Sequence, residues 1–285
     1  MPQVTDPRWR DTGGNYCRLA QGAGWKLVPV EQGQDWNGMA AWGSWGMVGG
    51  CYFWAHLGGG SHSDVTRMTW KQRYLVPLAR GEKLGCFCLS EPNAGSDAAN
   101  QETTARRDGD TYVLTWTKNF ISNGAEADVA IVFASLDRSK AHRGIAAFLV
   151  ERTCPGYTVA KLEKKLGIKG SSTAQIVLDG CRVPAENLIG REGEGFRQFS
   201  RTLDRGRVNV AALSVGLGQA ALDAATTYAR PREQFGKPIA AFQGVQWPIA
   251  EAATEIEAAR LLTLNAARMA DEGLPKTEEG GFQHI

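Results

Sequence analysis

Apolar and polar positions alternate in short runs between about residue 80 and residue 188, with turn residues between the runs. The runs are KLGCFCLS, ETTARR, TYVLTW, VAIVFASL, GIAAFLVERT and TAQIVLDG. A period of two is typical of strands that bury one face. Asp108-Gly109 supplies the positive φ angles of a tight hairpin, and Val183-Pro184 ends the strand region because proline cannot donate to a ladder. The pattern predicts an antiparallel, barrel-like or sandwich β domain over residues 71–188.

After Gly195 the apolar period becomes 3.6. One apolar stripe runs from Phe196 to Tyr228 and predicts a helix about 50 Å long. Gly236-Lys237-Pro238 interrupts the pattern, and a second stripe predicts an antiparallel helix in which Pro248 is tolerated only in the first turn. Two helices cannot fully cover both stripes, so a large apolar face is expected to be exposed in residues 189–285. The chain is therefore predicted to be α+β.

Residues 1–70 show neither period over a useful length. They hold 13 of the 34 glycines and 7 of the 9 tryptophans. The glycine content is typical of a linker, whereas seven tryptophans are too many for a solvated one. This head is left without a predicted fold.

Composition excludes several classes of protein. The 32 Lys+Arg and 30 Asp+Glu residues are scattered and leave a net charge of +2, so no electrostatic surface for nucleic acid is expected. We expect no membrane span, because no stretch approaches ~18 unbroken apolar residues, and a cytoplasmic protein, or one of the mitochondrial matrix if the source is eukaryotic. Six cysteines without a CxxC pair indicate reduced thiols, with Cys86 and Cys88 as packing residues. The four histidines lack metal-ligand spacing, so no metal site is predicted.

The stretch FCLSEPNAGSD (87–97) is the first candidate for chemistry. A strand that stops at a Glu-Pro bend presents backbone amides without ladder partners. Asn93 and Gly95 tolerate left-handed backbone and are expected to turn these amides outward, while Ser96 or Asp97 is expected to cap a short turn. Such a corner suits a flat ligand with carbonyls along one edge, or a phosphate. The alternative is an ordinary turn whose polar side chains bind no ligand.

Four motifs in one order give the chain a resemblance to the acyl-CoA dehydrogenase family. They are FCLSEPNAGSD (87–97), TKNFISNG (117–124), GREGEGF (190–196) and REQFGKPIAAFQGVQ (232–246). The resemblance runs from Lys71 to Leu274 with unshifted spacing. It implies an FAD-dependent oxidoreductase of fatty acid or amino acid catabolism that acts as a homotetramer or homodimer. It also implies a C-terminal four-helix bundle, of which residues 189–285 would form a truncated, incomplete part.

The resemblance also implies roles for individual residues. The backbone of Phe87 to Ser90 would meet the pyrimidine edge of the flavin, Phe120 would pack against the ring, and Ser122 would hydrogen-bond flavin N5, the atom that accepts hydride. The residues implied to bind the cofactor are Phe87, Cys88, Leu89, Ser90, Ser96, Phe120, Ile121, Ser122, Arg232, Phe235 and Gln243, the last three toward a neighbouring subunit. The residues implied to contact the acyl-CoA are Ser96, Asp204 and Arg207. For Arg232 the alternative is a helix-end cation, and for the acyl-CoA set a cap and two solvated helix charges.

The implied reaction is α,β-dehydrogenation of an acyl-CoA thioester, short or branched, with electrons passed to an electron-transfer flavoprotein. A carboxylate must remove the α-proton. Most members carry it near the C-terminus, where this chain reads EGGFQHI, and a minority carry it on the first long helix, where this chain has Gly206. Asp204 is one turn too early for the role, so the catalytic residue is left unassigned.

The sequence departs from the family at both ends, which suggests a gene fragment or a frame-shifted product. The helical N-terminal domain and the GGYG-type loop are not recognised, and Trp116, at a family glycine, is expected to crowd its strand. Two alternatives follow: a flavin- or CoA-binding remnant without turnover, and an acyl-CoA oxidase or flavin monooxygenase of the same fold.

Overall fold

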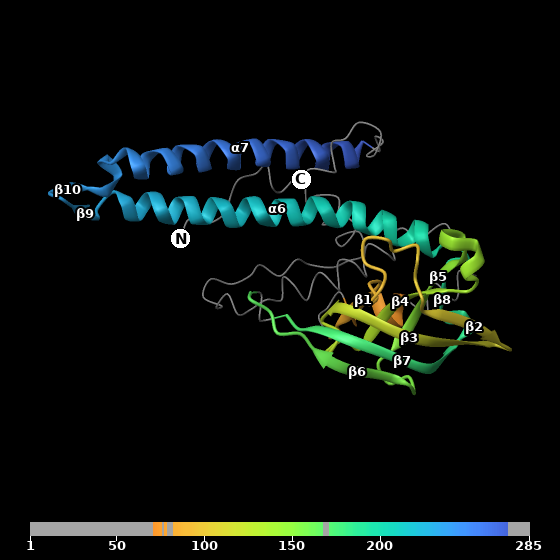
Figure 1. Cartoon of the computed structure of the whole chain (residues 1–285). Helices are drawn as coiled ribbons and strands as arrows, with labels where there is room; N and C mark the ends of the chain where they lie inside the picture. Colours follow the sequence, from red (N-terminus) through yellow and green to blue (C-terminus); the bar gives the residue numbers. More distant parts are fainter. Residues whose placement is uncertain (1–70, 76, 79–81, 168–170, 273–285) are drawn as a thin grey trace. The chain divides into compact units, whose positions relative to one another are not determined.

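The computed structural model describes residues 71–75, 77–78, 82–167 and 171–272. In this part the chain forms two compact units that divide between Thr202 and Leu203, and each is described by itself. The first unit contains a β domain and the second contains two long helices (Figure 1). The glycine- and tryptophan-rich head, residues 1–70, lies outside the described residues.

Eight strands and three short helical turns make up the β domain. In chain order they are η2 (Lys71–Leu75), β1 (Gly85–Cys88), β2 (Thr104–Asp108), β3 (Thr111–Ser122), β4 (Val129–Ser135), η3 (Arg138–Gly144), β5 (Ile145–Glu151), β6 (Tyr157–Leu162), β7 (Thr173–Pro184), η4 (Ala185–Asn187) and β8 (Leu188–Ile189). The hairpin predicted at Asp108-Gly109 joins β2 to β3, with Gly109 at φ +59°. Strand β7 ends at Pro184, but β8 follows in the same sheet, so the prediction that the strand region ends there is wrong.

The strands form one sheet in the order β6-β7-β3-β2-β4-β5-β8, with β1 paired to β4. Most neighbours are antiparallel, as predicted, but Gly85 of β1 pairs with Val129 in a parallel ladder. A single parallel pair, Thr104 with Ser135, joins β2 to β4. The β2–β3 hairpin separates β1 from β4 in the sequence, so β1 can lie beside β4 in the same direction. The sheet is therefore mixed rather than antiparallel throughout.

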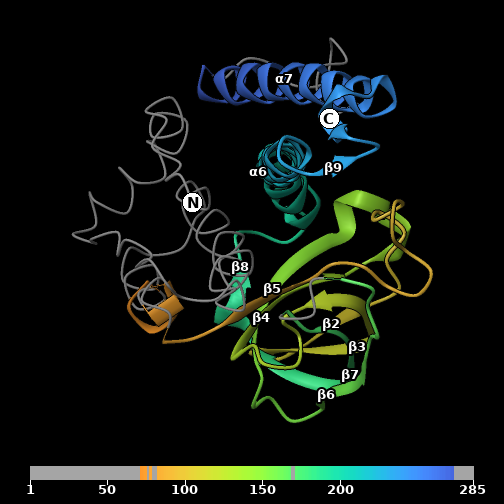
Figure 2. The ribbon, with the colours of Figure 1, turned by 90° about the vertical axis from the view of Figure 1, so that its left-hand side faces the viewer.

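The core of the β domain lies between two parts of this sheet. One part contains β6, β7, β3 and β2, and the other contains β1, β4, β5 and β8. Tyr112, Leu114 and Ile176 belong to one buried cluster with Val132 and Phe148 of the other part. The rings of Tyr112 and Phe148 lie 4.9 Å apart between centroids. Figure 2 shows β6, β7, β3 and β2 following one another, with β4, β5 and β8 beyond β2. The two parts thus share one core, as in the barrel-like packing that the strand pattern predicts.

Two irregularities in the β3–β7 ladder decide which side chains of β3 face outward. The pairing shifts between Leu114 and Trp116, opposite a stretch of β7 that contains Gly180 at φ +64°. It shifts again between Lys118 and Ile121, where β3 holds one residue more than β7. An extra residue in one strand reverses the inward and outward sequence after it. Trp116 lies at the first shift and has φ 148°, a backbone conformation that favours glycine, the residue that the family has at this position. Its side chain is exposed and does not point into the core.

The second unit contains α6 (Gly195–Ala229), which starts in the first unit, and α7 (Gln243–Asp271), joined by β9 (Glu233–Gln234), β10 (Lys237–Pro238) and η5 (Ile239–Ala241). The two helices contact one another through a hydrogen bond of 2.6 Å from Arg260 Nη2 to Gln219 Oε1. Pro248 lies inside α7, five residues after its start, so it falls in the second turn and the first-turn prediction is wrong. Its ring lies on an exposed position.

The apolar face predicted on the helices is exposed in the structure. Leu217 and Tyr228 of α6 and Leu261 and Leu262 of α7 are all more than half exposed. By length and composition, residues Gly206–Ala229 of α6 would suffice to cross a membrane, although unbroken apolar length gave no such segment. Core helices of soluble proteins pass the same test, so length and composition alone do not assign a span.

The described cysteines are free thiols in or beside the core of the β domain. Cys86 and Cys88 are buried, as predicted for packing residues, with their Sγ atoms 3.7 Å apart. Cys154 follows β5 and is half-buried, whereas Cys181 of β7 is fully buried. A hydrogen bond from the Cys181 thiol lowers the pKa of Cys154 to about 7, and the same contact raises the pKa of Cys181.

We expect Cys154 to react first with iodoacetamide among Cys86, Cys88, Cys154 and Cys181. The thiolate is the reactive form, so its alkylation rate should rise as the pH rises through about 7 and level off above about pH 8. Peptide mass spectrometry after timed labelling measures the rate at each site. Equal labelling of buried Cys88, or a rate for Cys154 that still rises steeply above pH 8.5, would contradict the expectation.

Candidate functional site

The corner after β1 is joined directly to the far end of β3. The Asn119 amide donates a hydrogen bond of 2.8 Å to the carbonyl oxygen of Ser90. Gln175 Nε2 of β7 donates to Asn119 Oδ1 at 2.7 Å and fixes the asparagine from its other side. The segments that carry the first two motifs therefore lie side by side, although nearly thirty residues separate them in the sequence.

The second shift of β3 turns an aromatic residue out of the sheet next to this junction. Lys118 faces the core, so an unbroken strand would also bury Phe120. The extra residue instead leaves Phe120 at φ 58° and 66% exposed, buries Ile121, and exposes Ser122. A bulky residue in the left-handed region is uncommon and costs of the order of 1 kcal/mol. The chain thus holds an aromatic ring and a hydroxyl outward in a strained conformation beside the corner.

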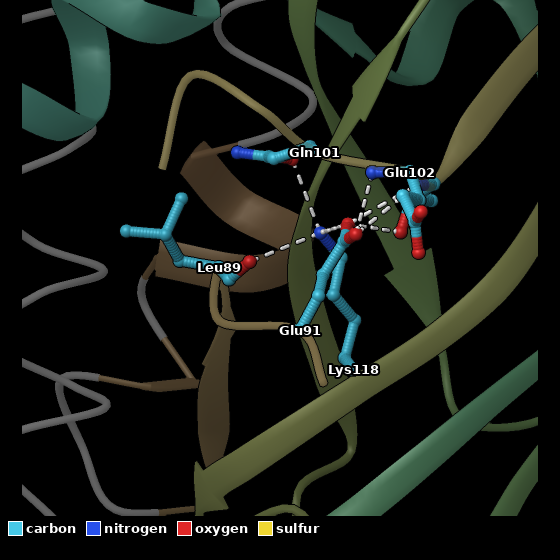
Figure 3. Close-up of polar contacts among 6 residues, drawn as sticks. Leu89, Glu91, Gln101, Glu102 and Lys118 are labelled. Carbon is cyan, nitrogen blue, oxygen red and sulfur yellow. Dashed lines mark hydrogen bonds and ion pairs between the residues drawn. The ribbon is translucent and has the colours of Figure 1, made fainter. Parts of the chain in front are cut away.

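A buried ion pair lies beneath the corner (Figure 3). Lys118 Nζ lies 2.7 Å from Glu91 Oε1, and neither side chain has solvent exposure. Lys118 Nζ also donates to the Leu89 carbonyl oxygen and to Gln101 Oε1, each at 3.1 Å. Burial lowers the pKa of Lys118, and the Glu91 carboxylate opposes that shift. An ammonium group has three N–H donors, and all three are used here.

Glu91 ties the loop that follows the corner to the start of β2. Its carboxylate accepts from the Glu102 amide at 2.6 Å and from the Thr103 amide at 3.1 Å, and it also accepts from the Thr103 hydroxyl at 2.5 Å. A tight turn is closed between Glu91 and Ala94, with the Glu91 amide 2.9 Å from the Ala94 carbonyl oxygen. Asn93 and Gly95 do not adopt positive φ, so the prediction that they turn the backbone is wrong. The Glu91 side chain closes the loop and makes left-handed residues there unnecessary.

The other side of Ser122 is held by a second set of polar contacts. Asn123 has φ 58°, and its backbone amide donates a hydrogen bond of 2.9 Å to the Ser172 carbonyl oxygen. The Ser171 hydroxyl donates to Asn123 Oδ1 at 2.9 Å, and the Ser172 hydroxyl hydrogen-bonds the Glu126 carboxylate. Lys165 Nζ donates to the Ser171 carbonyl oxygen at 2.6 Å. Positive φ angles at Phe120 and Asn123 therefore bracket Ser122, and hydrogen bonds fix both sides.

The structure brings some of the predicted site residues together. Leu89 and Ser90 lie at the junction with Phe120, Ile121 and Ser122. Phe87 and Cys88 belong to β1, where Phe87 packs on Phe133 with ring centroids 5.0 Å apart and Cys88 is fully buried. Ser96 is exposed on the loop that Glu91 anchors, beside the turn in which the Asn100 amide donates to the Asp97 carbonyl oxygen.

The remaining predicted residues belong to the helical unit. Arg232 and Phe235 are exposed on the connection between α6 and α7, Gln243 is exposed at the first position of α7, and Phe235 again has a positive φ of 53°. Arg207 is exposed on α6, and Asp204 lies on the same helix with its side chain outside the described part of the structure. The two units are described separately, so these residues remain predictions for the site.

Two residues of the site, Glu91 and Lys118, were not assigned a role from the sequence, and neither was Gln101. Lys118 has the inward parity set by Tyr112 and Leu114 on β3, which is a signal for a buried cation that needs a carboxylate. Glu91 lies 27 residues earlier, in a loop, so no local pattern pairs the two.

Comparison with known proteins places both units in one family. The model described as "Acyl-CoA dehydrogenase, middle domain" matches residues 86–181, and "Acyl-CoA dehydrogenase, C-terminal domain" matches residues 193–282. The short-chain specific acyl-CoA dehydrogenase of Rattus norvegicus mitochondria is 48% identical over 215 residues, which are 75% of this chain and 52% of that protein. The chain thus spans about half the length of the curated relatives it matches.

Solved structures give the same result. A chain in the structure described as the electron transferring flavoprotein of Acidaminococcus fermentans is 48% identical with a TM-score of 0.70, over 73% of this chain and 55% of that one. A glutaryl-CoA dehydrogenase of Mycobacterium smegmatis in complex with FADH2 is 32% identical with a TM-score of 0.70, over 81% of this chain and 55% of that one.

Proposed function

Because this chain belongs to the acyl-CoA dehydrogenase family, we propose that it carries out the α,β-dehydrogenation of a short- or branched-chain acyl-CoA thioester with FAD as its cofactor. The observation that carries the proposal is the junction of the β1 corner with the outward-turned end of β3 through Asn119 and Ser90. It brings Leu89 and Ser90 beside Phe120, Ile121 and Ser122, which are five of the residues that the resemblance assigns to the flavin, within the region that matches the family's middle domain.

The residues at this junction fit a flat, partly apolar ring. Phe120 offers an aromatic face that is held outward at the cost of backbone strain, and Ser122 offers a hydroxyl beside it. Strained conformations of this kind cluster at active sites and ligand-binding sites. When bound, FAD would supply the acceptor for the β-hydride at its N5 atom. We infer that Phe120 packs on the ring, that Ser122 holds it at N5, and that the backbone from Phe87 to Ser90 fixes its pyrimidine edge.

The resemblance also assigns ligand contacts to residues outside the junction. Arg232, Phe235 and Gln243 would reach the FAD of a neighbouring subunit, and the exposed positions of all three leave them accessible for that contact. Ser96, Asp204 and Arg207 would contact the acyl-CoA. Electrons would pass to an electron-transfer flavoprotein, consistent with the relative found in a structure described as such a flavoprotein.

Removal of the α-proton requires a carboxylate close to the substrate. Gly206 of α6 stands at one family position of this base and has no side chain. The second candidate function is that the chain binds flavin and acyl-CoA without turnover.

A flavin spectrum tests both functions. The purified chain is reconstituted with FAD, freed of unbound cofactor and mixed with butyryl-CoA without oxygen. If the chain is a dehydrogenase, the protein should keep an absorbance near 450 nm that bleaches when butyryl-CoA is added. The electron acceptor then separates a dehydrogenase from an oxidase: a dehydrogenase is re-oxidised by an electron-transfer flavoprotein, whereas an oxidase forms peroxide in air. Retained flavin without bleaching supports the binding function, and a colourless protein overturns both.

A further inference from the structure

Gln101, just before β2, has a buried amide nitrogen without a hydrogen-bond partner. The residue is 2% exposed, and its Nε2 atom makes no hydrogen bond within the described part of the structure. A buried amide N–H that has lost its water without gaining a partner is costly. Native proteins keep such groups where a ligand, an ion or a water completes them.

The orientation of this amide follows from the buried ion pair. Lys118 Nζ donates to Gln101 Oε1 at 3.1 Å, and an ammonium group cannot accept a hydrogen bond. An exchange of the amide oxygen and nitrogen would set two donors against each other, so Nε2 must point away from Lys118. Figure 3 shows the nitrogen turned from Lys118 toward the side on which the Leu89 side chain extends.

The partner that Nε2 lacks is an acceptor. The other members of the network already have partners: the Leu89 carbonyl oxygen accepts from Lys118, and Glu91 accepts from Lys118, Glu102 and Thr103. The remaining function of Gln101 is therefore to present its NH2 group, fixed in orientation, beside the corner.

We propose that Gln101 Nε2 donates a hydrogen bond to a carbonyl oxygen of the ligand bound at the β1 corner, and that Lys118 positions it for that contact. Carbonyl oxygens of this kind occur on the flavin ring and on the acyl-CoA, so the chemistry of recognition is shared by two sources. This inference rests on the proposed function and adds to it a binding residue that no motif assigns.

The test uses Gln101→Glu. This variant keeps an oxygen for Lys118, replaces the unpartnered donor by an acceptor and adds a negative charge near Glu91, whereas Gln101→Met removes the donor without adding charge. We measure the dissociation constant of FAD for the apoprotein by flavin fluorescence, and that of butyryl-CoA for the flavin-loaded protein by titration calorimetry. The constant of the ligand that Gln101 contacts should rise about tenfold or more, because a donor becomes a repelling oxygen. A rise for FAD alone identifies a flavin carbonyl, and a rise for butyryl-CoA alone identifies a carbonyl of the thioester.

Ser135→Ala is the matched control. Ser135 is also buried, its hydroxyl also lacks a partner in the described chain, and its amide bonds the Thr103 carbonyl oxygen at 2.7 Å near the same network. Removing this hydroxyl should leave both dissociation constants within about twofold of the wild type. Gln101→Met serves as a second donor-free variant if Gln101→Glu does not fold, and it should weaken the same ligand.

If both Gln101 variants bind both ligands within about twofold of the wild type, the inference is overturned and the proposed function stands. If the wild type takes up no flavin, the proposed function fails, and butyryl-CoA binding by the apoprotein then decides the inference. A tenfold loss of butyryl-CoA affinity in the Gln101 variants supports the inference. If the apoprotein does not bind butyryl-CoA, or if the variants bind it as tightly as the wild type, the inference is overturned.

Discussion

Replacing Lys118 by methionine is expected to lower the free energy of unfolding by about 3–5 kcal/mol, because it leaves the Glu91 carboxylate buried without its counter-charge. Both partners lie at 0% side-chain exposure, so water cannot replace the lost ammonium group. The Leu89 carbonyl oxygen and Gln101 Oε1 lose their donor in the same step. Urea unfolding followed by intrinsic fluorescence measures the change.

A double variant separates the charge from the packing. Glu91→Gln in the Lys118→Met background removes the unpaired carboxylate, so the double variant should be more stable than Lys118→Met alone. The surface pair of Arg182 Nη2 and Asp108 Oδ2 is the control, since its atoms lie 2.6 Å apart but its side chains are 57% and 43% exposed. Arg182→Gln should have a far smaller effect. A loss below about 1 kcal/mol in Lys118→Met, or no recovery in the double variant, would contradict this account of the corner.

The parts of the fold that follow a local period were predictable from the sequence. Six strand runs, the Gly109 hairpin and both helices follow from alternation, turn chemistry and apolar stripes. Strand β6 was not predicted because Tyr157–Leu162 is an edge strand with mostly exposed residues and no clear apolar face. Strand β8 has two residues, too few for any pattern. The parallel pairing of β1 with β4 depends on how distant segments meet, which no local period records.

The sequence predicted the part of the candidate site that lies within short motifs. The resemblance placed a ligand at residues 87–90 and 120–122, and the structure joins these segments through Asn119 and Ser90. It gave no means to see that Glu91 and Lys118 meet in the core, because their attraction acts across 27 residues of sequence. The left-handed residues expected at Asn93 and Gly95 occur instead at Phe120, within the second shift of β3, and at Asn123, directly after the end of that strand.

Phe120→Gly is expected to raise the dissociation constant of FAD about ten- to a hundredfold while the domain stays folded. The phenyl ring is 66% exposed, so covering it with a ligand would contribute about 1.5–3 kcal/mol to binding. Phe120 has φ 58°, which glycine adopts without strain. Relief of that strain offsets the larger entropy that glycine gives the unfolded chain, so the free energy of unfolding should change by less than about 1 kcal/mol.

Two further variants decide whether the aromatic ring itself is responsible. Phe120→Trp keeps an aromatic face and should retain FAD affinity near the wild-type value. Leu162→Ala removes another exposed apolar side chain, on β6 of the same sheet, and should leave it unchanged. Fluorescence titration with FAD and urea unfolding on the same samples provide both measurements. If Phe120→Gly binds FAD as tightly as the wild type, the strained backbone at Phe120 does not serve flavin binding, because a ring held outward at a cost to the fold would then contribute nothing to the ligand.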